Sequence, residues 1–341
     1  MRASDFEYDL PAELIAQRPL ARRDESRLLV LKRATGQVQH RRFVDLPELL
    51  QPGDVLVLNQ SKVIPARLRG RKPTGGRAEV LLVKALDGRT WQALVRPGLR
   101  VGQRVRFGEG PDVLVGRVVC VEEDGLRQVE FDRADDDLRQ AIWRLGEMPT
   151  PPYVREKLRH PDEYQTVYAS VEGSVAAPTA GFHFTPEMLA RLRQRGYQLE
   201  FVTLHVGLGT FQPVKAEEVS AHRMHAEYCH VEPEVARRLG EARRERRRLV
   251  AVGTTSVRTL ETAADAEGLV QPFLGETRLF IYPGYRFKAV DAMVTNFHLP
   301  RSTLLMLVCA FAGLEPVLRA YAEAVRQRYR FYSFGDAMLI G

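Results

Sequence analysis

Several polar passages in this chain of 341 residues follow apolar runs and carry side chains that bind anions or move protons. In VGTTSVRTLE, an apolar run leads into Gly253 and the hydroxyls of Thr254, Thr255 and Ser256, where we expect a helix to begin. Free backbone amides at a helix N-terminus hold a carboxylate or a phosphate, and Arg258 could pair with the same anion. The alternative is an ordinary Ser/Thr cap after a packing glycine. No Walker lysine follows, which argues against a nucleoside triphosphate.

The passage LHVGLGTF places His205 at the end of an expected strand, before Gly207 and Gly209. It is not a GxGxxG fingerprint, because Thr210 and Phe211 follow and no helix begins there. Two glycines allow a backbone to approach a flat ligand closely, although a tight turn is the simpler interpretation.

The passage HRMHAEYCH holds five residues that can bind metals: His222, His225, Glu227, Cys229 and His230. HExxH spacing is absent, and HxxH sets two side chains only loosely on one helix face. We therefore favour a solvated helix over a zinc site and predict no metal. In VTNFHLPRSTLLM, Asn296 and His298 precede a helix capped by Ser302 or Thr303, which by itself indicates a loop and a cap.

The elements that must position these passages form two patterns. Before residue 66 the sequence predicts a short helix at Pro11–Gln17, a hairpin around Ala34-Thr35-Gly36 and a buried strand at 55–58. From about residue 150, strands alternate with helices, which is typical of an α/β layer. Thr185 should cap one helix, HRMHAEYCH should be helical, and YQLEFVTLHV, LVAV and RLFIY should be strands.

Between these parts, short β-rich pieces are separated by glycine turns, which indicates a small antiparallel barrel. We therefore predict an α/β main domain, a mixed sheet with flanking helices, made from residues 1–65 and 150–341. The smaller antiparallel β-barrel domain, residues 66–149, is inserted into it.

The composition favours a polyanionic partner without proving one. The net charge is +7 and the cysteines, three in number, form no CxxC pair. We interpret the basic cluster at the start of the barrel as RNA-binding: Arg67, Arg69, Arg71 and Lys72. The N-terminus has no apolar signal region, and the longest apolar run, 304–312, is too short to cross a bilayer. We expect a soluble cytoplasmic monomer with no membrane contact.

Long strings taken together resemble one family, from the first expected helix to the last strand. They include FEYDLPAELIAQRP, RDESRLLVL, LNQSKVIPARL, PPYVREKLRHPDEYQTVYA, GSVAAPTAGFHFT, VTLHVGLGTFQPV, AVGTTSVRTLE, VTNFHLPRSTLLMLVCAFAG and YRFYSFGDAMLI. The chain resembles the S-adenosylmethionine:tRNA ribosyltransferase-isomerases of queuosine biosynthesis. Residues 73–145 match least, and the family's two-domain shape agrees with the predicted barrel insertion.

The resemblance implies a specific reaction. The ribosyl part of S-adenosylmethionine moves onto 7-aminomethyl-7-deazaguanine at the wobble position of a tRNA with a GUN anticodon. The sugar becomes an epoxycyclopentanediol, giving epoxyqueuosine, while adenine and methionine leave. S-adenosylmethionine is then a consumed co-substrate, and no cofactor is implied.

This chemistry needs a base for the acidic carbon beside the sulfonium, a proton donor for adenine and an acceptor for the amine proton. Our candidates are His183, His205 and Asp336, the last as a carboxylate that would also stabilise the sulfonium. For the methionyl carboxylate we expect the 254–256 helix start with Arg258, and for its ammonium Glu261. The remaining predicted substrate contacts are Ser174, Thr179, Gly181, Gly207, Gly209, Asn296 and His298.

Two other functions compete with this one. A tRNA methyltransferase needs a glycine-rich loop after its first Rossmann strand, and the sequence has none there. A non-catalytic RNA-binding protein is the third interpretation, and the absence of RNP or KH signatures argues against it.

Overall fold

The computed structural model describes residues 1–122, 125–207 and 216–341, which form two compact units. The first contains Met1–Ser61, Pro151–Val171 and Ala177–Gly341, and the second contains Lys62–Thr150 and Glu172–Ala176. The sequence placed the insertion at 66–149 and assigned Glu172–Ala176 to the main domain. The difference arises where β12 (Val171–Ser174) pairs with β4 (Ser61–Val63) in a two-stranded sheet.

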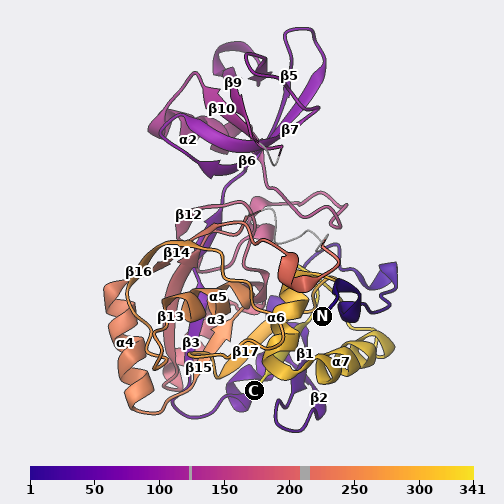
Figure 1. Cartoon of the computed structure of the whole chain (residues 1–341), viewed down its shortest axis with the longest axis vertical. Helices are drawn as coiled ribbons and strands as arrows, with labels where there is room; N and C mark the ends of the chain where they lie inside the picture. The colour runs from indigo at the N-terminus through magenta and orange to yellow at the C-terminus, as the bar shows by residue number, and fades with distance from the viewer. Residues whose placement is uncertain (123–124, 208–215) are drawn as a thin grey trace. The chain divides into compact units, whose positions relative to one another are not determined.

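A nine-stranded mixed sheet organises the first unit, in the order β16-β14-β13-β3-β15-β17-β18-β1-β2 (Figure 1). The strands are β1 (Arg27–Leu31), β2 (Val38–Arg42), β3 (Val55–Asn59), β13 (Gln198–Leu204), β14 (Glu227–Val231), β15 (Leu249–Val252), β16 (Phe273–Thr277), β17 (Ala292–Asn296) and β18 (Ala337–Ile340). Strand β3 is parallel to β13 and β15, and β15 is parallel to β17. Strand β18 runs antiparallel to β17. The predicted α/β class with a mixed sheet is confirmed.

The sheet is buried on both faces, which explains its nearly continuous apolar strands. In β3, Val55 and Val57 belong to one core cluster, while Leu56 and Leu58 belong to the other. The first cluster includes side chains of α4 (Pro233–Arg244), α5 (Thr254–Ala263), α6 (Thr303–Ala312) and α7 (Leu314–Arg326). The second includes side chains of α1 (Leu46–Leu49) and α3 (Pro186–Gln194). Helices therefore cover both faces (Figure 1).

Helices α6 and α7 are the most apolar consecutive pair. Among the described residues, no single helix is long and apolar enough to cross a membrane. These two pass that test only as a pair, by length and composition, with a bend of 115° between them.

Local signals fixed several elements correctly. The Thr185 hydroxyl accepts a hydrogen bond from the Met188 amide at 3.2 Å, so Thr185 caps α3 as predicted. The hairpin around Ala34–Gly36 joins β1 and β2, and the predicted strands YQLEFVTLHV and LVAV become β13 and β15.

Three local predictions are wrong. The helix expected at Pro11–Gln17 is a 3₁₀ turn, Ala12–Leu14. The passage HRMHAEYCH is not helical, because its end alternates in burial and pairs with two neighbours as β14. RLFIY is not a strand, since its backbone bonds to side chains instead: the Leu279 carbonyl accepts from Arg258 and the Leu279 amide donates to Thr277.

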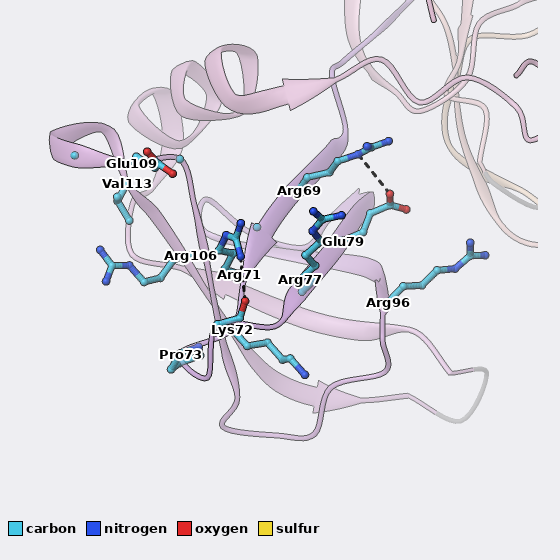
Figure 2. Close-up of a pocket in the computed structure, with 15 residues that line it drawn as sticks. Arg69, Arg71, Lys72, Pro73, Arg77, Glu79, Arg96, Arg106, Glu109 and Val113 are labelled. Carbon is cyan, nitrogen blue, oxygen red and sulfur yellow. Dashed lines mark hydrogen bonds and ion pairs between the residues drawn. The ribbon is translucent and has the colours of Figure 1, made fainter. Parts of the chain in front are cut away.

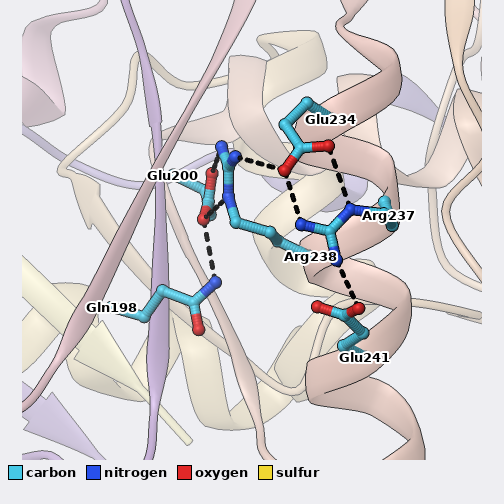
Figure 3. A network of polar contacts seen from close by, with 6 residues as sticks. All are labelled: Gln198, Glu200, Glu234, Arg237, Arg238 and Glu241. Atoms are coloured by element: carbon cyan, nitrogen blue, oxygen red, sulfur yellow. Dashed lines mark hydrogen bonds and ion pairs between the residues drawn. The ribbon is translucent and has the colours of Figure 1, made fainter.

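A charged network fastens α4 to the sheet (Figure 3). Glu200 of β13 is buried and accepts hydrogen bonds from Arg238 Nε and Nη2, both at 2.7 Å. The side-chain amide of Gln198 donates to the same carboxylate at 2.8 Å. This bidentate geometry sets the register of the helix against β13 as well as contributing energy.

The second unit is an antiparallel barrel, as predicted. Its strands are β5 (Arg67–Arg71), β6 (Arg77–Ala85), β7 (Thr90–Arg96), β8 (Arg104–Phe107), β9 (Leu114–Val121), β10 (Arg127–Phe131) and the short β11 (Gly146–Glu147). The order β11-β5-β6-β7-β10-β9-β8 closes through pairing of β5 with β8. Helix α2 (Asp135–Leu145) precedes β11.

Candidate functional site

Polar residues gather at one edge of the nine-stranded sheet. Because β3, β13, β15 and β17 are parallel, their carboxyl ends meet at this edge. Ligands bind at such an edge in open α/β sheets. Gly253 and Thr254 follow β15, and Asn296 ends β17. The turn η7 (Thr179–His183) contacts the same region through Asn296.

Two small cavities lie at this edge, each of about 30 Å³. Thr179, Asn296, His298 and Leu304 line both of them. The first is completed by Tyr153, Phe297, Leu299, Ser302, Tyr332 and Ser333, and the second by Ala177, Pro178, Ala180, Val206, Gly253, Thr254, Thr255 and Thr295. Such a volume accommodates about one water molecule or one functional group of a ligand. A whole nucleoside is several times larger.

The N-terminus of α5 lines the second cavity. Gly253 is its N-cap with φ of 88°, and no side chain caps the helix. The amides of the first turn therefore keep their capacity to bind an anion. The Thr255 hydroxyl is buried and has no hydrogen-bond partner in the part of the chain that the structure describes. The Ser256 hydroxyl, by contrast, donates to the Val252 carbonyl at 2.8 Å and stays inside the helix–strand turn.

His298 also lines both cavities, and its imidazole has one unengaged nitrogen. Within the described residues, the ring makes a single hydrogen bond, from Nε2 to the Thr295 hydroxyl at 2.7 Å. Its backbone is held separately, because Tyr321 accepts from its amide and Tyr8 donates to its carbonyl. Burial lowers the pKa of His298 to about 3, so the ring is neutral near pH 7.

His183 is buried in a hydrogen-bonded chain. The Thr179 hydroxyl donates to Asn296 Oδ1 at 2.8 Å, and Asn296 Nδ2 lies 3.2 Å from His183 Nε2. Because Nδ2 can only donate, Nε2 accepts, and the proton of the neutral ring is on Nδ1. Nδ1 then donates to the Ser26 hydroxyl at 2.7 Å. The ring also stacks on Phe43 at 4.9 Å.

The pKa of His183 is lowered to about 3, mainly by burial and then by the charges of Arg23 and Arg330. Both ring nitrogens of His183 are hydrogen-bonded, and the lowered pKa keeps the ring neutral near pH 7. The predicted proton-transfer role of His183 stays a prediction, and the geometry gives it a positioning role through Asn296.

Two buried neutral histidines make stability depend on pH. Unfolded, each has a pKa near 6.5, whereas folded His183 and His298 have pKa values of about 3. Between these values the unfolded chain binds more protons, so stability falls as pH falls from about 6.5 and is unaffected above it. At pH 5 we expect a loss of roughly 2 kcal/mol for each histidine.

Thermal or urea unfolding at pH 7 and pH 5 measures this dependence. His183→Gln, which cannot titrate, should show a smaller loss between the two pH values than the wild type, even if it is less stable at both. An equal loss in the variant would contradict the assignment of a strongly lowered pKa to His183.

Comparisons with known proteins agree with this architecture. The family model described as queuosine biosynthesis protein matches residues 3–340. The chain belongs to the queuosine biosynthesis protein family. It is 59% identical, over all of both chains, to a protein of Symbiobacterium thermophilum named S-adenosylmethionine:tRNA ribosyltransferase-isomerase. A protein of Moorella thermoacetica with the same name is 57% identical over the same coverage.

A solved structure is also similar. It is the crystal structure at 2.00 Å of an S-adenosylmethionine tRNA ribosyltransferase from Thermotoga maritima, 44% identical, with a TM-score of 0.57. The similarity covers 99% of this chain and 100% of the other.

In this member of the queuosine biosynthesis family, Arg258 is not the free cation that its position in the sequence predicts. Its Nη1 pairs with the buried carboxylate of Glu227, and its Nε donates to the Leu279 carbonyl at 3.0 Å. Among the described residues Nη2 has no partner, and Arg258 lines neither cavity. Glu227 balances the charge of Arg258, and the expectation that Arg258 pairs with a substrate anion stays a prediction.

The glycine passage after β13 is only partly described. His205 stacks on Tyr228 at 5.1 Å, and burial lowers its pKa to about 4. Its Nδ1 is buried and has no partner within residues 1–122, 125–207 and 216–341. Gly207 donates its amide to Glu227 at 2.8 Å, and an added Cβ would meet nothing closer than 3.6 Å. Gly209 lies outside the described residues, and the roles predicted for His205 and Gly207 stay predictions.

The two predicted carboxylates bind backbone amides. Asp336 is buried, and its oxygens accept from the amides of Arg27 at 2.9 Å and Arg330 at 2.8 Å. Burial is the main cause that raises the pKa of Asp336. We infer a structural contribution, and its predicted catalytic role remains untested.

Glu261 accepts from the amides of residues 288, 289 and 290 and from the Tyr285 hydroxyl. These hydrogen bonds hold the loop at 288–290, and the prediction that Glu261 binds an ammonium stays a prediction.

Two residues of the string GSVAAPTAGFHFT, Gly181 and Ser174, contact other parts of the protein. A Cβ on Gly181 would lie 2.0 Å from the Tyr168 hydroxyl and 2.8 Å from Thr166. The glycine therefore makes room for Tyr168, and the predicted ligand contact of Gly181 stays a prediction. Ser174 belongs to the second unit, where its hydroxyl donates to the Ala176 carbonyl at 2.6 Å.

The metal-capable residues do not converge. No group of three or more His, Cys, Asp or Glu side chains in the described part of the chain could hold a metal ion. Glu227 and Cys229 are instead buried members of β14. The absence of a metal stays a prediction.

Three of the predicted RNA-binding residues, Arg69, Arg71 and Lys72, line a groove of about 930 Å³ on the barrel (Figure 2). Arg67 does not line it; its Nη2 donates to the Thr150 carbonyl at 3.3 Å. The sequence analysis missed Arg77, Arg96 and Arg106, which also line the groove. Their signal is an arginine at a strand end, which is visible only once the strands are paired.

Sequence analysis also missed Thr295 and Ser26, which hold the two buried histidines. Thr295 lies within VTNFHLP and Ser26 within RDESRLLVL, so both were inside strings that carried the resemblance. Nothing in either string indicates which histidine each hydroxyl would contact.

Proposed function

We propose that this chain is an S-adenosylmethionine:tRNA ribosyltransferase-isomerase. It transfers and isomerises the ribosyl part of S-adenosylmethionine onto 7-aminomethyl-7-deazaguanine at the tRNA wobble position, giving epoxyqueuosine, adenine and methionine. The observation that carries this is the full-length identity of 59% to a relative bearing that name. The proposal includes a GUN anticodon, a cytoplasmic monomer and no cofactor besides the consumed co-substrate.

The sheet edge supports a place for part of S-adenosylmethionine. Its methionyl carboxylate fits the second cavity, where the uncapped start of α5 and the unpartnered Thr255 hydroxyl supply donors. An anion there also interacts favourably with the positive end of the helix dipole. Arg258 contributes indirectly, by fixing Glu227 behind the helix.

His298 is the side chain best placed to touch the reacting substrate. It lines both cavities, and its Nδ1 is unengaged within the described residues, whereas both nitrogens of His183 are bonded. A buried neutral imidazole contributes as a fixed hydrogen-bonding group without first changing its charge. Thr179 and Asn296, which line the same cavities, complete the polar lining.

The reaction requires three proton transfers, which define the roles that these groups would have. The base must remove a proton beside the sulfonium, adenine must leave as a neutral or protonated ring, and the amine must lose a proton. A neutral His298 can hold the purine or accept a proton, and its low pKa favours the hydrogen-bonding role. His205 and Asp336 stay as further candidates for the base.

Thr255→Val tests the carboxylate site. The change removes the hydroxyl but keeps the β-branched shape, so we expect the KM for S-adenosylmethionine to rise about 10- to 100-fold, as for one lost hydrogen bond to a charged group. The KM for tRNA should not change. Ser256→Ala, whose hydroxyl bonds inside the turn, serves as the matched control. An unchanged KM for S-adenosylmethionine in Thr255→Val would place the carboxylate elsewhere.

Product analysis tests the function itself. The purified chain is incubated with S-adenosylmethionine and tRNA that carries the aminomethyl-deazaguanine, and nucleosides, adenine and methionine are measured by mass spectrometry. Epoxyqueuosine with equal amounts of adenine and methionine is expected. S-adenosylhomocysteine among the products would indicate a methyltransferase, and RNA binding without adenine release would indicate a non-catalytic protein.

A further inference from the structure

The groove on the barrel is densely basic. Six cationic side chains line it: Arg69, Arg71, Lys72, Arg77, Arg96 and Arg106. Two acidic residues, Glu79 and Glu109, lie among them. Figure 2 shows these side chains on β5, β6, the turn between them and the neighbouring strand ends, all within the second unit. The groove therefore carries a net positive charge, and this charge comes from its own lining residues.

Most of these cations have no ion partner. Arg69 lies 3.2 Å from Glu147 and 3.8 Å from Glu79. Among the described residues, no carboxylate lies within 4 Å of the other five. In the described part of the chain, the Arg71 side chain donates only to the Gly75 carbonyl, at 3.2 Å. The charge is therefore available to a ligand and is not consumed by the fold.

Strand pairing forces like charges together in this groove. Arg71 of β5 is directly opposite Arg77 of β6 on one side and Arg106 of β8 on the other. Like charges in facing positions destabilise a sheet. An anion that bridges these arginines would relieve their repulsion.

We propose that this groove binds the sugar-phosphate backbone of RNA. Several separate cations along one groove match the repeated charges of a backbone better than a single small anion. The lining contains no aromatic side chain for stacking on bases, so the contact should be independent of sequence. The identification of this RNA as the substrate tRNA rests on the proposed function. The affinity of the groove for a sugar-phosphate backbone is independent of that function.

The test compares two triple variants of equal charge. The groove variant is Arg77→Gln, Arg96→Gln and Arg106→Gln. The control variant is Arg117→Gln, Arg139→Gln and Arg144→Gln, three exposed arginines of the same unit that do not line the groove and have acidic partners. Fluorescence anisotropy measures binding of an unmodified tRNA transcript at several salt concentrations, after circular dichroism and thermal unfolding confirm that both variants fold.

The groove variant should bind the transcript at least 10-fold more weakly than the wild type at about 100 mM salt. Its slope of log affinity against log salt should fall by about 2, since each lost phosphate contact removes about 0.7 to 0.9. The control variant should stay within about 2-fold of the wild type. Equal weakening in both triples, or no weakening in the groove variant, would overturn the proposal.

Two further measurements separate this proposal from the proposed function. Wild-type product analysis reports on the function alone, and the groove variant's binding defect stands or falls without it. If the wild type is active, the groove variant should raise the KM for tRNA while leaving the KM for S-adenosylmethionine unchanged. A fluorescent poly-glutamate peptide probes the other polyanion class: tighter binding of the peptide than of RNA, lost in the groove variant, would assign the groove to an acidic protein instead.

Discussion

His298→Ala is expected to lower kcat/KM for adenine release by about 100- to 1,000-fold, the usual effect of removing one preorganised hydrogen-bonding group. The reason is geometric. His298 lines both cavities at the sheet edge with an unengaged ring nitrogen, and burial lowers its pKa to about 3, which keeps it neutral. The backbone bonds to Tyr8 and Tyr321 do not involve the ring, so the loop should keep its path in the variant.

Steady-state kinetics with labelled S-adenosylmethionine measures this effect. Because folded His298 stays neutral, the wild-type pH profile between pH 5 and 8 should show no step that disappears in His298→Ala. Thr295→Val, which removes only the partner of Nε2, should cost about 10-fold, as expected of a positioning residue. His225→Ala, an exposed histidine outside the cavities, is the control. Activity of His298→Ala within a few-fold of the wild type would exclude direct contact with the reacting substrate.

Arg258→Met is expected to destabilise the first unit by about 3 to 5 kcal/mol, because it leaves the carboxylate of Glu227 buried without its cation. Both side chains are 5% exposed. In a unit of this size the loss corresponds to a fall in Tm of about 10 °C. Thermal unfolding followed by circular dichroism measures it, with the exposed and helix-paired Arg319→Met as the control.

The double variant tells a charge effect from a packing effect. Arg258→Met with Glu227→Met removes both charges, so it should recover part of the Tm lost by Arg258→Met alone. If the double variant is less stable than the sum of the two single variants predicts, packing around the pair outweighs the charge. Thermal stability of Arg258→Met close to that of the wild type would refute the buried-pair assignment.

Local sequence patterns were sufficient to predict a strand that is buried on both faces, a helix cap and a hairpin. The strand at Val55–Asn59 is apolar at its first four positions, and both faces of its sheet are covered by helices. The cap at Thr185 and the hairpin at Ala34–Gly36 depend on neighbouring residues alone. Glu227–Val231 could not be assigned from its own residues, because only pairing with two distant strands makes it a strand.

The site shows the same division. The sequence by itself determined which passage follows β15, since an apolar run that leads into a glycine and hydroxyls is a local pattern. Strand β17 was not predicted, because VTNFHLP by itself indicates a loop. Tertiary structure decided which of these side chains are free. His183 is bonded to residues 157 and 113 positions away, and Arg258 to one 31 positions away. The basic groove likewise exists because barrel closure sets Arg106 opposite Arg71. A buried polar group needs a hydrogen-bond partner. Residues distant in sequence therefore decide whether that partner is another part of the protein or a ligand.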